Sequence, residues 1–166
     1  MRIRPYIPGK DYEALARWID NEKVHALWCA NLLPCPLTPE SFHDFLTASS
    51  MTWTDSAFVA TENSGEVRGF FCYGVNLKDN TGFLKFVIVD SSRRGMGYGT
   101  EMLRLALRYA FEITGVKAVL LNVFDENTAA KQCYKKAGFV ERRTDRNVFA
   151  YGDELWSRCN MIVSGR

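Results

Sequence analysis

The 166-residue sequence has no excess charge of one sign, no long apolar run and no sign of a cleaved leader. Its 21 Lys and Arg residues oppose 19 Asp and Glu residues, a balance that does not favour nucleic acid or an anionic membrane as a partner. No stretch approaches the ~18 apolar residues of a transmembrane helix, and the first residues lack the apolar segment of a signal peptide. We therefore expect a cytoplasmic protein that binds neither membrane nor nucleic acid.

The sequence also lacks the spacing of a disulfide framework or a metal site. The five cysteines are Cys29, Cys35, Cys72, Cys133 and Cys159. Their number is odd and no C-x-x-C pair occurs, which argues against both disulfides and a zinc knuckle. His25 and His43 lie near the first two cysteines, but the irregular spacing across a proline-rich segment is not that of a ligand set. We expect reduced thiols and no metal.

What the chain does contain is typical of a packed globular domain, with 47% hydrophobic and 24% charged residues. Its length predicts one domain over residues 1–166. Apolar residues at helical spacing predict a first helix over 11–20, with Asp11 as its cap. A second helix is predicted to begin at Thr38, with Pro39 at its first position. The segment 28–33 has no clean period, so no element is predicted there.

From residue 57 onward the pattern alternates between strands and helices. Predicted strands cover 57–61, 67–75, 83–89, 116–124, 139–149 and 155–163, and predicted helices cover 99–114, closed by Gly115, and 128–137, closed by Gly138. The order is strand, two helices, three strands, helix, strand, helix, two strands. A strand, helix, strand passage over 83–124 implies a right-handed crossover between parallel neighbours. The fold class is therefore α/β (α+β) with a mixed sheet.

The densest chemical signal is the segment 89–100, Val-Asp-Ser-Ser-Arg-Arg-Gly-Met-Gly-Tyr-Gly-Thr, between a buried strand and an amphipathic helix. Glycines let the backbone approach a ligand, and the first N–H groups of the helix attract anions. Thr100 and Met102 stand where the dinucleotide fingerprint G-x-G-x-x-G requires its last glycine, and no Gly-Lys-Ser/Thr is present. The glycines therefore predict a pyrophosphate site other than these two, the alternative being a simple tight turn.

Two motifs resemble a known family. The first, Arg94-x-x-Gly97-x-Gly99, resembles the Gln/Arg-x-x-Gly-x-Gly/Ala signature of the GNAT superfamily of N-acetyltransferases, which bind acetyl-CoA through that loop. The second, N-x-x-A-x-x-x-Y-x-x-x-G-F, is matched over 127–139. The resemblance covers residues 57–140, and the first 50 residues are loosely similar to the ribosomal-protein N-terminal acetyltransferase branch.

The resemblance implies a fold, a co-substrate and a set of contacts. The GNAT fold has a mixed central sheet, here of about six to seven strands with about four helices, and a V-shaped splay between the strands 83–89 and 116–124. The implied partners are acetyl-CoA and an amine acceptor, either a small molecule or a protein or peptide amine, with a monomer or homodimer as the oligomeric state. The cofactor-binding residues implied by the family are Val87, Ile88, Val89, Arg94, Gly95, Met96, Gly97, Tyr98, Gly99, Thr100 and Asn127.

The family also implies the chemistry. Tyr134 lies seven residues after Asn127, two helical turns along, and its phenol would protonate the departing CoA thiolate as the general acid. The acetyl group would pass by direct attack of the amine in a ternary complex, without a covalent cysteine step. We expect Asn127 also to cap its helix. Candidates for an aromatic wall around the acceptor are Trp28, Trp53, Tyr73 and Phe124.

The general base is not identified by the motifs. Ribosomal-protein N-terminal acetyltransferases often carry a glutamate where this chain has Asn122, an amide that cannot accept a proton. Asp90, Asp125 and Glu126 are the nearby carboxylates, and an ordered water is the alternative proton acceptor. Two competing hypotheses stay open: a catalytically silent acyl-CoA-binding module, motivated by Asn122, and nucleotide binding by the glycine loop.

Overall fold

The computed structural model describes residues 1–165, which form one sheet of seven strands, five α-helices and two short helical turns. In chain order the elements are β1 (Arg2–Pro5), α1 (Pro8–Trp18), α2 (Glu22–Cys29), α3 (Pro39–Trp53), β2 (Ser56–Thr61), β3 (Val67–Asn76), β4 (Thr81–Val89), η1 (Ser91–Arg93), α4 (Tyr98–Arg108), η2 (Tyr109–Ile113), β5 (Ala118–Phe124), α5 (Thr128–Lys136), β6 (Val140–Tyr151) and β7 (Glu154–Ser164). Every strand and helix predicted after residue 56 is present. The α/β fold with a mixed sheet is confirmed.

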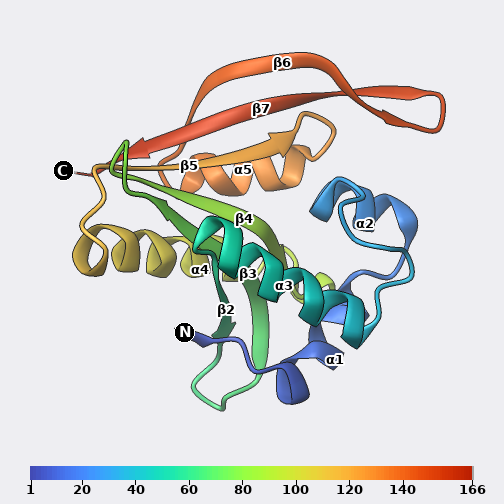
Figure 1. The fold of residues 1–166 in the computed structure, drawn as a ribbon, viewed down its shortest axis with the longest axis horizontal. Helices are drawn as coiled ribbons and strands as arrows, with labels where there is room; N and C mark the ends of the chain where they lie inside the picture. The colour runs from blue at the N-terminus through green and yellow to red at the C-terminus, as the bar shows by residue number, and fades with distance from the viewer. Residues whose placement is uncertain (166) are drawn as a thin grey trace.

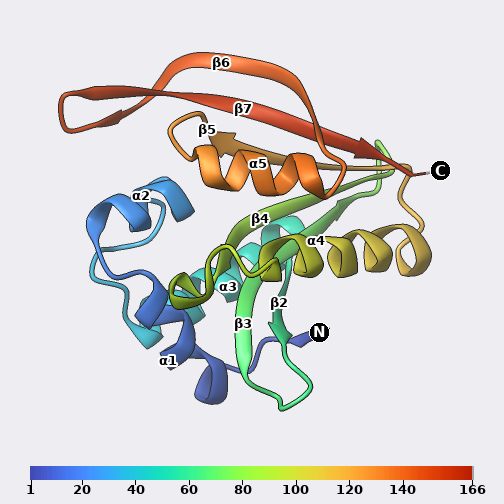
Figure 2. The ribbon, with the colours of Figure 1, turned by 180° about the vertical axis from the view of Figure 1, so that it is seen from behind.

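The sheet has the order β1-β2-β3-β4-β5-β7-β6, and β4 with β5 is its parallel pair. Figures 1 and 2 show α3 on one face of the sheet and α4 with α5 on the other. The helices on each face of the sheet cover a separate apolar cluster. On one face α1, α2 and α3 pack on side chains such as Phe70, and on the other α4 and α5 pack on side chains such as Leu121. The long β6–β7 hairpin projects past the sheet and over α2 (Figure 1).

The parallel pairing between β4 and β5 is short, and its length determines where the sheet opens. Residues of β4 and β5 pair from Thr81 with Ala118 to Leu84 with Leu121, after which the pairing stops although both strands continue. Figure 1 shows the two strands beginning side by side and then diverging. The predicted V-shaped splay is therefore present, and it leaves one edge of β4 without a neighbouring strand over its second half.

A β-bulge in β4 lies just beyond this point. Phe86 has φ 52°, a left-handed conformation that is rare for a bulky residue, and the register with β3 shifts there. Regular alternation would put Leu84 and Phe86 on one face of the sheet. Instead Leu84 and Val87 pack under α4 and α5, whereas Phe86 and Ile88 pack under α1, α2 and α3. The bulge thus reverses which residues of β4 face each side.

The amino-terminal helices differ in part from the prediction. Helix α1 begins at Pro8, so Asp11 is not its cap. Asp11 is instead fully buried in the first turn, where its carboxylate accepts hydrogen bonds from the Ile7 N–H at 2.8 Å and from both terminal nitrogens of Arg4 at 2.7 Å. Helix α3 begins as predicted, with Thr38 and Ser41 forming a reciprocal capping box.

Helix α2 was not predicted, and the physical reason is its burial on two sides. Trp28 packs into the cluster under α1 and α3, while Ala26 packs against Trp156 of the β6–β7 hairpin. A helix buried on two faces has no single apolar stripe, so its sequence shows no helical period. The N-cap of α2 is Asn21, whose side chain accepts the Val24 N–H at 2.9 Å. None of the helices within residues 1–165 is long and apolar enough to cross a membrane.

Candidate active site

The glycine loop leads from β4 into α4 and exposes backbone to solvent. Gly95 has φ 80° and Gly97 has φ 86°, and a Cβ at either position would meet nothing within 4 Å. These positive φ values favour glycine. Gly97 is the N-cap of α4, so the first amide groups of a helix of 11 residues open into this space. Arg94 is exposed beside it, as is Met96.

Gly99 serves a different purpose in the same loop. A Cβ at Gly99 would lie 2.9 Å from the Cys133 sulfur of α5, closer than side-chain carbons approach other atoms. Thr100 places its hydroxyl 3.5 Å from the same sulfur. Gly99 therefore allows the amino-terminal end of α4 to pack closely on α5, and Cys133 is a packing residue.

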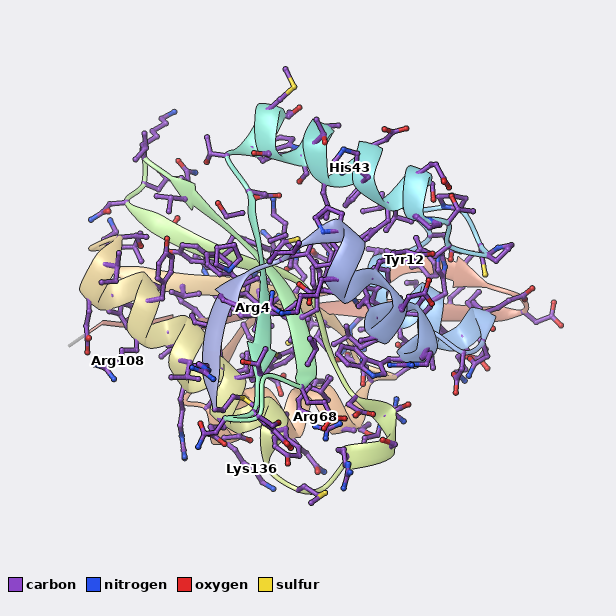
Figure 3. All side chains as sticks on the ribbon, turned by 90° about the horizontal axis from the view of Figure 1, so that it is seen from below. Arg4, Tyr12, His43, Arg68, Arg108 and Lys136 are labelled. Carbon is purple, nitrogen blue, oxygen red and sulfur yellow. The ribbon has the colours of Figure 1, made fainter. Side chains whose placement is uncertain are left out.

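The buried guanidinium of Arg68 anchors the residues that flank the glycine loop. Arg68, at the start of β3 (Figure 3), pairs with Asp90 at 2.9 Å, with Glu62 at 3.0 Å and with Glu66 at 2.6 Å. The hydroxyl of Tyr98 donates a hydrogen bond to Glu62. The ring of Tyr98 therefore faces this cluster of charged residues, and its backbone belongs to the loop. The cluster fixes both ends of the glycine loop.

The Asp90 carboxylate accepts hydrogen bonds from its neighbours. Burial alone would raise the pKa of its carboxyl, but hydrogen bonds from Ser92 and Arg68 outweigh this and lower the pKa below its usual value. Asp125 is similarly engaged, since its carboxylate accepts from the Lys131 ammonium at 2.6 Å. Glu126 is exposed at the entrance to α5.

The second half of β4 presents backbone groups toward the splay. The Asp90 N–H donates to the Arg68 carbonyl at 2.9 Å, and Ile88 is opposite Phe70. Because hydrogen-bonded and non-hydrogen-bonded pairs alternate in an antiparallel ladder, Ile88 directs its backbone toward β3 and Val89 directs its backbone toward the edge that β5 has left. Of these two predicted cofactor contacts, the backbone of Val89 faces the open edge and that of Ile88 faces the sheet.

The bulge itself is held by a side chain from α2. The indole Nε1 of Trp28 donates a hydrogen bond of 2.8 Å to the carbonyl oxygen of Phe86. In a trans peptide the C=O and the following N–H point in opposite directions. The N–H of Val87 therefore points away from Trp28 and away from the face that α2 covers.

Tyr134 lies on the opposite face from Trp28. Its side chain is 6% exposed and packs edge-to-face on Phe139, with ring centroids 6.0 Å apart. Burial raises the pKa of the Tyr134 hydroxyl, and Cys133 adds a smaller contribution. The phenol therefore stays protonated at neutral pH. Asn127 caps α5 as predicted, accepting the Ala130 N–H at 3.3 Å.

A cavity of about 540 Å³ lies on the α2–α3 face, where β4 and β5 diverge. Its lining residues are Leu27, Trp28, Cys29, Ala30, Leu32, Phe45, Ala48, Ser49, Thr52, Trp53, Phe83, Leu84, Lys85, Phe86, Asn122, Val123, Phe124 and Arg158. Asn122 stands in the wall, and its side-chain oxygen accepts from Asn160 at 2.9 Å. Among residues 1–165, no Asp or Glu belongs to this lining.

The aromatic wall is only partly as predicted. Trp28, Trp53 and Phe124 line the cavity, but Tyr73 does not. Tyr73 faces the other side of the sheet, where its hydroxyl lies 2.7 Å from the Thr114 hydroxyl, because β3 alternates its side chains between the two faces.

Sequence reasoning missed three further rings and two cations in this wall, namely Phe45, Phe83, Phe86, Lys85 and Arg158. The alternation of side chains along β4 could have predicted the position of Phe83. No sequence pattern predicts the bulge that redirects Phe86. Lys85 is joined to the buried Asp55, with Nζ to carboxylate oxygen distances of 2.8 and 3.0 Å.

The fold agrees with comparisons to known proteins. The chain matches the Acetyltransferase (GNAT) family over residues 13–139, and it belongs to this family. An N-alpha-acetyltransferase of Sulfurisphaera tokodaii is 27% identical over 128 residues, which cover 71% of this chain and 77% of the relative. A mycothiol acetyltransferase of Amycolatopsis mediterranei is 27% identical over 155 residues, covering 86% of this chain and 47% of the relative.

The chain thus spans about half the length of the mycothiol acetyltransferases that it matches. Among solved structures, a spermidine N-acetyltransferase from Vibrio cholerae in complex with CoA and spermine has a TM-score of 0.82 at 18% identity, covering 98% of this chain and 94% of that one. This similarity shows the fold. The predicted membership of the GNAT superfamily is confirmed, and the chain is an acetyltransferase of that family.

Proposed function

We propose that this chain transfers the acetyl group of acetyl-CoA to a primary amine, with the two substrates meeting across the gap between β4 and β5. The observation that carries the proposal is the arrangement around that gap. The glycine loop, the open edge of β4 and Tyr134 belong to the α4–α5 side, and the cavity lies on the α2–α3 side. An acyl donor and an acceptor on opposite sides can react by direct attack without exchanging places.

The pyrophosphate of acetyl-CoA would be held by the loop before α4. Gly95, Gly97 and Gly99, with Met96 and Tyr98 between them, supply backbone N–H groups there, and α4 adds the positive end of its dipole. Arg94 supplies an exposed cation and Thr100 a hydroxyl.

The pantetheine arm would run beside the open edge of β4 like an additional strand. Val87 and Val89 offer backbone groups to it, Ile88 supports them from within the sheet, and Asn127 closes the other side at the start of α5. The N–H of Val87 is the donor that would polarise the thioester carbonyl, because the Trp28 hydrogen bond to Phe86 turns it away from the α2 side.

In the transfer step the amine nitrogen attacks the thioester carbon, the carbon–sulfur bond breaks and the acetyl group forms an amide. Tyr134 donates its hydroxyl proton to the departing thiolate, and the surplus proton of the amine passes to water. No cysteine need carry the acetyl group. Cys133 is engaged in packing, and burial raises the pKa of the Cys29 thiol in the cavity wall, which keeps it a neutral and weak nucleophile.

The experiment that tests this proposal follows thiol release from acetyl-CoA over a panel of amines, together with acetyl-CoA binding by calorimetry. Tyr134→Phe should lower kcat by about 100-fold or more while acetyl-CoA binds as before, as expected for loss of a general acid. Tyr73→Phe is the matched control, since it removes a phenol on the same side of the sheet that contacts Thr114 instead. Full turnover in Tyr134→Phe would show that the acid is another group.

The same assay addresses the alternative of a silent acyl-CoA-binding module, which Asn122 and the absence of a carboxylate in the described cavity wall favour. That alternative predicts tight acetyl-CoA binding with no amine-dependent thiol release. A single domain, a monomer or homodimer, a cytoplasmic location and the absence of nucleic-acid or membrane partners remain predictions.

A further inference from the structure

We infer that the acceptor is an amine on an apolar or aromatic body with no second positive charge, and that Lys85 is the residue that selects it. This inference rests on the proposed acetyl transfer, and it follows from the chemistry of the cavity wall. Apart from a few polar side chains, the lining is aliphatic and aromatic. Its charged members are Lys85 and Arg158, both cations.

The Lys85–Asp55 pair presents its positive end to the cavity. Asp55 is buried, its side chain 2% exposed, whereas the side chain of Lys85 is 26% exposed. The Asp55 carboxylate accepts two hydrogen bonds from the Lys85 ammonium and one of 2.5 Å from the Ser49 hydroxyl. A ligand in the cavity therefore meets the ammonium and is shielded from the carboxylate.

Two features of the surroundings keep this arrangement in place. On β3, a Cβ at Gly74 would lie 2.2 Å from an Asp55 carboxylate oxygen, so a glycine is required where the carboxylate sits. On the cavity side, the Lys85 nitrogen lies 5.6 Å from the centre of the Trp53 ring and 6.0 Å from that of Phe83. These are cation–π distances, and they hold the charge at the wall.

The rim of the cavity indicates what the rest of the acceptor is like. Trp53 is 65% exposed and Leu32 is 66% exposed, and both line the cavity. Large apolar side chains left in water at the mouth of a concave site are typical of ligand binding. An apolar body would cover them, whereas a polyamine would bring further ammonium groups next to Lys85 and Arg158.

The same charge would help the reaction. An ammonium near a fixed cation loses its proton more easily, so Lys85 lowers the pKa of the bound acceptor and favours the neutral amine that attacks.

The other titratable groups facing Lys85 or the cavity are Asp55, Arg158, Cys29 and Cys72. The two thiols stay neutral because burial raises their pKa, and Arg158 is paired with Asp145 at 3.1 Å. An acceptor whose ammonium lies near the Lys85 ammonium depends less on a carboxylate at position 122 to become neutral.

The test compares 2-phenylethylamine with spermidine as acceptors of acetyl-CoA, measured by thiol release. We expect kcat/KM to be about tenfold or more higher for 2-phenylethylamine, which corresponds to one unfavourable charge contact of modest strength. The double variant Lys85→Met with Asp55→Asn removes both charges and leaves neither unpaired. It should lower that preference about tenfold, and the acid limb of the kcat profile for 2-phenylethylamine should move to higher pH.

The matched control is Lys78→Met with Asp79→Asn, a like change in the exposed turn between β3 and β4, which should alter neither ratio nor profile. Spermidine equal to or better than 2-phenylethylamine, or an unchanged preference in the Lys85 double variant, would overturn the inference. If no amine releases thiol, acetyl transfer itself is wrong. Calorimetry of the two amines on the CoA-saturated protein then decides the inference separately, since it requires 2-phenylethylamine to bind more tightly.

Discussion

The indole N–H of Trp28 and the carbonyl oxygen of Phe86, 58 residues apart in the chain, are joined by a hydrogen bond of 2.8 Å. This contact ties helix α2 to the bulge of β4 at the point where β4 and β5 separate. Phe86 holds a left-handed conformation there, which is strained for an aromatic residue and persists only where its surroundings impose it. Trp28 is one of the groups that impose it.

Trp28→Phe should therefore impair turnover more than binding. The variant keeps an aromatic ring but leaves the Phe86 carbonyl without its donor, at a cost of about 1–3 kcal/mol in the free energy of unfolding. With the Val87 N–H less well directed, we expect kcat for amine acetylation to fall about tenfold while the dissociation constant of acetyl-CoA changes less than twofold. Steady-state kinetics and calorimetry measure the two effects.

Trp18→Phe is the control for this prediction, because Trp18 is buried in the same apolar cluster but lies on α1 and outside the cavity wall. It should destabilise the protein without selectively lowering kcat. A Trp28→Phe enzyme with unchanged kcat would show that the hydrogen bond has no part in directing Val87.

Arg94→Ala should weaken acetyl-CoA binding. Arg94 is exposed beside the glycine loop, where its guanidinium would meet the pyrophosphate, so we expect the KM for acetyl-CoA to rise about tenfold and its dependence on salt to decrease. Arg104→Ala, on the exposed side of α4, is the comparison and should leave the KM within about twofold. Equal effects of the two substitutions would mean that only the general charge of the surface matters.

Gly99→Ala should destabilise the protein through contact with one sulfur atom. The new Cβ would lie 2.9 Å from the Cys133 sulfur, and overpacking of this kind costs about 1–3 kcal/mol in the free energy of unfolding. Cys133→Ala removes the sulfur, so the double variant should be more stable than the sum of the two single changes implies. Urea denaturation of the four proteins gives the coupling energy, and strict additivity would contradict the packing role of Gly99.

Asp11 makes the stability of the amino-terminal helix depend on pH. Burial alone would raise the pKa of Asp11, but hydrogen bonds from Arg4 and the Ile7 N–H outweigh it and lower the pKa (Figure 3 labels Arg4, which lies on β1). A lowered pKa in the folded state adds stability that is present above the unfolded value of about 4 and is lost as the pH falls through the folded value.

Asp11→Asn should therefore cost about 2–3 kcal/mol in the free energy of unfolding at pH 7, with the difference from the unchanged protein narrowing below about pH 4. Urea denaturation from pH 7 to pH 3 measures this. Glu13→Gln changes an exposed carboxylate of the same helix and should have little effect at any pH. A constant difference across the range would mean that packing, and not charge, explains the loss.

The glycine loop and the elements after residue 56 could be predicted because their signals are local. Gly97 is needed where the backbone takes a positive φ, and Tyr134 follows Asn127 by two helical turns within a single helix. The pairing of Asp90 could not be predicted, since it depends on Arg68, a residue from a different strand.

The sequence by itself determined the family, the order of strands and helices over residues 56–165, the glycine loop and Tyr134 as the candidate general acid. Each of these depends on residues within a few helical turns of one another. The tertiary structure decided the rest: helix α2, the direction of the Val87 N–H and the charge at the cavity wall. These depend on contacts such as Trp28 with Phe86 and Lys85 with Asp55, which join segments 58 and 30 residues apart. Only packing of the helices on the sheet creates such contacts, and no period in the sequence records them.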